Sequence, residues 1–129
     1  MDKEVFQGWL DRYIEAWRSY DPAAIGDLFS EEATIHYNPY TSDVVRGREA
    51  IVNDWLGGRD EPGSWRASYS AVACDGDVCV ATGTSEYLTA DRSAVDKIYY
   101  NAFICQFDGE GRCKGYTEYF MQPPKPEGS

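Results

Sequence analysis

The spacing of apolar residues changes at Trp65, and this change constrains the fold more than any other feature of the sequence. Upstream of it, apolar side chains recur every three or four residues, as on one face of a helix. The first such set is Phe6, Leu10, Tyr13, Ile14 and Trp17. Downstream, apolar side chains alternate, as on one face of a strand. The first such set is Trp65, Ala67, Tyr69 and Ala71. Helices followed by antiparallel strands predict an α+β fold, with the helices on one face of a curved sheet.

The first half of the chain predicts a long N-terminal helix, two shorter helices and one strand. Asp21 and Pro22 supply an N-cap and a first-turn proline for the second helix. Its short apolar face is Ile25, Leu28 and Phe29. A strand over residues 33–37 follows, and residues 40–46 read as a loop. The third helix is predicted over residues 47–56, because two glycines come directly after it.

The second half predicts four long strands joined by polar turns. The first strand runs from Trp65 to a turn at residues 75–77, and the others cover residues 78–88, 97–107 and 113–121. No repeat or domain boundary interrupts this pattern, so residues 1–122 are predicted to form a single domain. Residues 123–129 are rich in proline and carry no core residue, and we expect them to form a flexible tail.

Charge and cysteine usage exclude several classes of function. A formal net charge of -10 disfavours nucleic acid and anionic membranes as partners. No segment is apolar for long enough to span a bilayer and no secretory pattern precedes the first helix, so a cytoplasmic protein is expected. The cysteines match no zinc or redox motif, and no metal or cofactor is expected. Free thiols are the default for all of them; a cross-strand disulfide between Cys74 and Cys79 is the alternative, since the predicted turn separates them.

Aromatic side chains with polar tips are unusually abundant. Aromatics make up 15% of the chain, with ten tyrosines and four tryptophans. Tyr13 and Trp17 lie on the buried face of the first helix, where a hydroxyl and an indole N–H each need a partner. Either the core satisfies these groups, or they line a cavity.

Three segments resemble the nuclear-transport-factor-like superfamily, in its SnoaL-like and ketosteroid-isomerase-like branch. They read DRYIEAWRSYDPAAIGDLFSEEATIHYNP, GREAIVNDWL and FDGEGRCKGYTEYF, in this order. The resemblance implies a cone, in which a bent, mixed sheet wraps around the long N-terminal helix and leaves an apolar pocket. It also implies a homodimer that forms through the outer face of the sheet.

Comparison with ketosteroid isomerases assigns Tyr13 to the place of their oxyanion-stabilising tyrosine. The place of their carboxylate base holds Tyr37, with His36 beside it, and their second oxyanion donor falls near Phe103. The chain therefore keeps one of the three groups, and steroid isomerisation by the same mechanism is not expected. The arginine and two aspartates of limonene epoxide hydrolases have no counterparts either.

The resemblance also directs particular strand residues toward the pocket. On the third long strand these are Tyr99, Asn101, Phe103 and Cys105, and on the last strand Tyr116, Glu118 and Phe120. A carboxylate in an apolar cone has a raised pKa and suits general acid–base work. Glu118 and His36 are therefore the candidate acid–base pair, with Tyr13 as a hydrogen-bond donor. The alternatives are a surface or dimer-face ion pair for Glu118, and an ordinary polar strand position for His36.

The remaining lining is predicted from the aromatic residues of the helices and the first strands. It comprises Trp17, Tyr37, Trp55 and Tyr69, together with the strand residues above. We expect a small, largely apolar organic molecule as ligand, with cofactor-free chemistry of the isomerase, cyclase, dehydratase or hydrolase type. A non-catalytic binding protein of the same fold and a dimeric adaptor whose cone is filled by its own aromatics are the alternatives.

Overall fold

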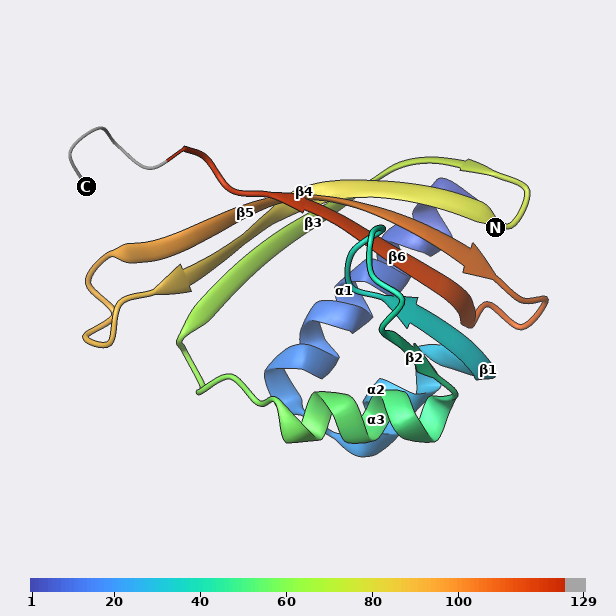
Figure 1. The fold of residues 1–129 in the computed structure, drawn as a ribbon. Coiled ribbons are helices and arrows are strands. Elements are labelled where there is room, and N and C mark those ends of the chain that lie inside the picture. The colour runs from blue at the N-terminus through green and yellow to red at the C-terminus, as the bar shows by residue number, and fades with distance from the viewer. Residues whose placement is uncertain (125–129) are drawn as a thin grey trace.

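The computed structural model describes residues 1–124 and confirms the predicted α+β fold. Three helices, α1 (Lys3–Ser19), α2 (Pro22–Asp27) and α3 (Arg48–Gly57), lie on one side of a curved six-stranded sheet (Figure 1). None of the helices among these described residues is both long and apolar enough to cross a membrane. Of the tail predicted over residues 123–129, residues 125–129 lie outside the described part.

Helix α1 is fixed at both ends by its own sequence. The Asp2 carboxylate accepts a hydrogen bond from the Val5 N–H at 2.8 Å and caps the first turn. Tyr20 ends the helix in the left-handed region, with φ 51°, and its N–H donates to the Ala16 carbonyl at 2.8 Å. One stripe of α1 is buried, as the helical spacing predicts. It consists of Phe6, Trp9, Leu10, Tyr13 and Ala16.

The strands are β1 (Phe29–His36), β2 (Val44–Arg46), β3 (Trp65–Asp75), β4 (Val78–Leu88), β5 (Val95–Phe107) and β6 (Cys113–Met121). Their order in the sheet is β2-β1-β6-β5-β4-β3. All neighbours pair antiparallel except β1 and β6, which are parallel, so the sheet is mixed as expected. In this register Phe103 lies opposite Glu118, and Asn101 lies opposite both Gly83 and Phe120.

Two predictions for the first half are wrong, and long-range pairing is the reason in both. β1 begins at Phe29, which was expected in the second helix, because Phe29 pairs with Cys113 of β6 and the Cys113 N–H donates to the Leu28 carbonyl at 2.9 Å. β2 occupies part of the predicted loop, because its three residues pair with the end of β1. The residues near Phe29 and in the predicted loop do not show which distant strand they pair with.

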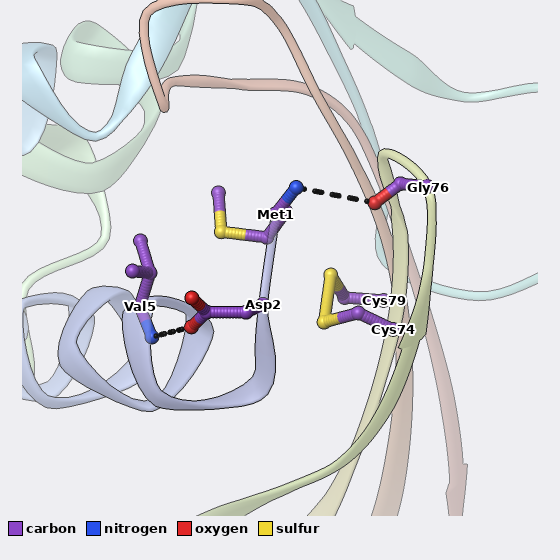
Figure 2. Close-up of a disulfide and its surroundings, with 6 residues drawn as sticks. All are labelled: Met1, Asp2, Val5, Cys74, Gly76 and Cys79. Atoms are coloured by element: carbon purple, nitrogen blue, oxygen red, sulfur yellow. Dashed lines mark hydrogen bonds between the residues drawn. A yellow bond between two sulfur atoms is a disulfide. The ribbon is translucent and has the colours of Figure 1, made fainter.

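A disulfide joins Cys74 to Cys79 across the β3–β4 hairpin (Figure 2), so the expectation of free thiols is wrong for this pair. The two residues face each other in the strand register. Cys105 and Cys113 are free and buried, as expected. Figure 2 also shows Met1 beside the disulfide, with its amino group donating to the Gly76 carbonyl at 3.3 Å. The start of α1 is thereby held against the hairpin turn.

Of the glycines in residues 1–124, Gly83 has the closest neighbours. A Cβ atom added there would contact the Ser68 carbonyl oxygen and lie 2.8 Å from the Tyr69 Cα, both on β3. We predict that Gly83→Ala lowers the free energy of unfolding by about 2–3 kcal/mol, as overpacking against backbone does. Urea unfolding followed by circular dichroism measures this loss.

Gly115 provides the matched control. It also lies inside a strand, but an added Cβ would meet only the Gln106 side chain, at an ordinary 3.8 Å. Gly115→Ala should change stability by no more than about 1 kcal/mol. Equal effects of the two substitutions would show that the close approach at Gly83 is not a real constraint.

Candidate functional site

A cavity of about 590 Å³ opens between α1, α3 and the inner face of the sheet. We call it the tyrosine pocket, because tyrosine is its commonest lining residue. Its lining comprises Tyr13, Trp17, Tyr20, Tyr37, Asn38, Asp54, Trp55, Gly58, Asp60, Tyr69, Ser85, Tyr87, Lys97, Tyr99, Asn101, Glu118 and Phe120. Helix, strand and loop residues thus converge on one space.

A chain of three hydroxyl and carboxyl groups connects α1 with β6 at this pocket. The Tyr116 hydroxyl donates to Oε1 of Glu118 at 3.3 Å, and its oxygen lies 3.5 Å from the Tyr13 hydroxyl oxygen. The Tyr13 and Tyr116 rings are stacked, with centroids 5.8 Å apart. Burial raises the pKa of both tyrosines well above the ordinary value, so both stay neutral and act as hydrogen-bond donors.

Glu118 is the perturbed carboxyl group of the pocket. Burial raises its pKa to about 7, and the hydrogen bond from Tyr116 opposes part of that rise. Glu118 is buried because it lies on the inner face of β6, opposite Phe103. Near neutral pH the group is divided between acid and carboxylate, the condition under which a carboxyl can both give and take a proton.

A second polar cluster lies on β3, β4 and β5. The Tyr69 hydroxyl and the Ser85 hydroxyl are 2.6 Å apart, and Nδ2 of Asn101 donates to the Ser85 oxygen at 2.9 Å. Burial and, to a smaller extent, the charge of Glu118 raise the pKa of Tyr69. All three side chains line the pocket, so a ligand in contact with them meets polar groups that are held in place by one another.

Two aspartates hold the aromatic walls. The Tyr37 hydroxyl donates to Oδ2 of Asp54 at 2.9 Å. Asp60 accepts at Oδ2 from the Trp17 indole N–H at 3.0 Å and from the Tyr20 hydroxyl at 3.5 Å. The Asp60 N–H in turn donates to the Tyr20 oxygen at 2.9 Å, which ties the loop after α3 to the end of α1.

The sequence-based predictions of the lining fit this geometry with four exceptions. Phe103, Cys105 and Tyr116 are buried but do not line the tyrosine pocket. Tyr69 packs over Phe103 at 4.7 Å between centroids, and Tyr13 stacks on Tyr116. His36 is the fourth. Ala33 and Ile35 of β1 point to the core, so His36 points to the opposite face and the predicted His36–Glu118 pair does not form.

Several lining residues were missed, and only some of them had a signal in the sequence. Ser85 and Tyr87 follow from the alternation Cys79, Ala81, Gly83 along β4, in which inward residues are odd-numbered. Asp60 lines the pocket from a loop, where no periodicity marks an inward residue, and its hydrogen bonds to Trp17 and Tyr20 hold it there. Within residues 1–124, no three His, Cys, Asp or Glu side chains converge as metal ligands would.

A SnoaL-like domain is matched by residues 10–111, which is most of the chain. The chain belongs to the SnoaL-like domain family. Its fold is shared by solved structures of other proteins. An NTF-2 like protein of unknown function from Burkholderia xenovorans LB400 superposes with TM-score 0.70 at 18% identity, over 97% of this chain and 89% of that one. A protein from Kribbella flavida DSM 17836, named provisionally as a ketosteroid isomerase, gives TM-score 0.69 at 15% identity, over 98% and 85%. No curated protein matches the sequence.

The raised pKa of Glu118 predicts a specific pH dependence of stability. Its folded-state pKa, about 7, exceeds the ordinary value of 4.5, so folding favours the protonated form and the stability contributed by this group is lost as pH rises from about 4.5 to about 7. Glu118→Gln removes that loss. We expect the variant to gain about 2 kcal/mol over the wild type at about pH 8, after allowance for partial exposure, and little at about pH 5.

Urea unfolding of both proteins at the two pH values measures this difference. Glu32→Gln, at an exposed position of β1, removes one negative charge elsewhere and is the control. A gain for Glu118→Gln that is the same at both pH values would contradict the assigned burial of the carboxylate.

Proposed function

We propose that this SnoaL-like protein binds a small organic molecule with a largely apolar body in the tyrosine pocket. The observation that carries the proposal is the pocket itself, whose volume of about 590 Å³ lies within the range of ligand sites. Ring faces supply apolar contact, while Glu118 and Asn101 supply polar contact from neighbouring strands. A cone filled by its own aromatics, as in an adaptor protein, would leave no such space.

Glu118 is the proposed general acid–base group for a reaction on that molecule. Its pKa of about 7 permits proton transfer in either direction near neutral pH, and the Tyr116 and Tyr13 hydroxyls connect it to α1. Tyr13 itself lines the pocket and is the proposed donor to a ligand carbonyl or hydroxyl oxygen. Such a pair suits isomerase, dehydratase, cyclase or hydrolase chemistry. His36 has no part in it.

Binding is tested by placing a large side chain on the wall of the tyrosine pocket. Gly58 lines the pocket at the end of α3, whereas its neighbour Gly57 does not and has no atom within 4 Å of an added Cβ. Small molecules found by ligand-observed NMR screening should bind the wild type and Gly57→Trp alike. Gly58→Trp should weaken them by about tenfold or more, through steric exclusion. Ligands that bind both variants equally would place the binding site elsewhere.

Catalysis is tested with the same ligands. Glu118→Gln keeps the size of the side chain and its acceptor oxygen but cannot transfer a proton at neutral pH. We expect ligand binding to be retained and any turnover to fall by about a hundredfold or more. Turnover that survives the substitution would leave a binding protein without a role for Glu118 in chemistry.

We further propose that two copies associate through the outer face of the sheet, as the resemblance to the superfamily implies. This face carries exposed apolar side chains on the two central strands β5 and β6, namely Tyr100, Ile104 and Tyr119. An exposed apolar patch of this kind is typical of a protein contact. Burial of the patch in a homodimer would remove it from water.

Sedimentation analysis tests the dimer. The wild type should sediment as a dimer, and Ile104→Lys should shift it toward monomer, because an unpaired charge would be buried. Val5→Lys, at an exposed apolar position of α1, is the control and should leave the dimer intact. A wild type that remains monomeric at high concentration contradicts the proposal.

A further inference from the structure

The tyrosine pocket contains more negative than positive charge. Three carboxylates line it, Asp54 from α3, Asp60 from the following loop and Glu118 from β6. Among residues 1–124, Lys97 is the only basic side chain in the lining. Asp54 and Asp60 belong to the helical side of the cavity and Glu118 belongs to the sheet. An anionic ligand would be repelled by both aspartates, and also by Glu118 where that group is ionised.

The aromatic walls of the pocket also favour a cation over an anion. Nine of the 17 lining residues are aromatic, and the face of each ring carries partial negative charge that attracts cations. Two of these rings already hold cations of the protein itself. Nζ of Lys97 lies 5.8 Å from the Tyr87 ring centroid, and the Arg59 guanidinium lies 5.5 Å from the Tyr20 ring centroid. Ring faces of the pocket are therefore accessible to positively charged groups.

Hydrogen bonding within the walls also leaves acceptors for a ligand. The Tyr37 hydroxyl donates to Asp54, and the Trp17 N–H donates to Asp60. In both aspartates the atom that accepts these bonds is Oδ2. Oδ1 accepts neither of them and is the oxygen available to a ligand ammonium group. The two wall donors are thus engaged by carboxylates that line the pocket.

We propose that the ligand of the tyrosine pocket is an organic cation, a protonated amine or quaternary ammonium compound with an apolar body. This inference rests on the proposed binding function and specifies its ligand class. The cationic head lies against ring faces and between Asp60 and Glu118, and the apolar body covers Trp55 and Tyr69. Recognition of this kind combines cation–π attraction with desolvated ion pairing.

Two probes of equal shape test the inference. Benzyltrimethylammonium carries the charge, and neopentylbenzene replaces the charged nitrogen with carbon. Affinities are measured at about pH 8, where Glu118 is ionised, from tryptophan fluorescence, to which Trp17 and Trp55 of the pocket contribute. The cation should bind about tenfold more tightly than its neutral isostere.

Two double variants test whether the carboxylates of the pocket cause the preference for the cation. Asp60→Asn with Glu118→Gln should reduce the preference for the cation severalfold. Glu31→Gln with Glu32→Gln removes the same number of charges at exposed positions of β1 and should leave the preference unchanged. Equal loss in both double variants would mean that net charge alone attracts the probe, and would overturn the inference.

The outcomes also separate this inference from the proposed function. Equal or tighter binding of neopentylbenzene by the wild type, blocked by Gly58→Trp, would overturn the cationic ligand and leave a pocket for neutral molecules. Failure of both probes and of every screened compound would remove the proposed function together with the inference.

Discussion

The indole of Trp9 joins the parts of this protein that lie far apart in sequence. Its N–H donates to the Leu28 carbonyl at 2.9 Å, at the junction of α2 and β1. Its ring packs edge to face against Phe29 of β1 and Phe107 of β5, with centroids 6.0 and 5.4 Å apart. One side chain therefore holds α1, the second helix and two strands at fixed distances. Because the indole is fully buried, this hydrogen bond also satisfies the one polar atom that the side chain brings into the core.

The character of α1 changes along its length, and this change creates the tyrosine pocket. Phe6 and Trp9 form a dry aromatic core with Phe107. One turn later Tyr13 still packs against Trp9, but its hydroxyl reaches Tyr116. Two turns later Trp17 lines the pocket and stacks on Trp65 at 3.5 Å. The same helical face thus belongs to the aromatic core at its beginning and to the wall of the tyrosine pocket at its end.

Some features of the fold and of the pocket could be predicted from the sequence, and others could not. Local spacing was sufficient for α1 and the long strands, because each carries a regular apolar pattern over two or more turns or several alternations. α3 was placed by the two glycines that follow it, since its buried residues are only Ile51 and Trp55. The inward direction of Tyr99, Asn101 and Glu118 followed from alternation once the resemblance had set the parity. The side of the sheet that His36 occupies and the existence of β2 depend on pairing between distant segments, which local residues do not encode. Asp60 was missed for the same reason, since its partners are on α1.

The sheet order has a consequence for how the protein assembles during synthesis. The edge formed by β1 and β2 is attached to the remaining strands only through β6, the last strand of the chain. The first strand to be made must therefore wait for the last one before it has its parallel neighbour, and such distant pairings form slowly. Glu118 lies on that closing strand. The strand that joins the two parts of the sheet, and that is synthesised last, is therefore also the one that places the Glu118 carboxyl group on the inner face.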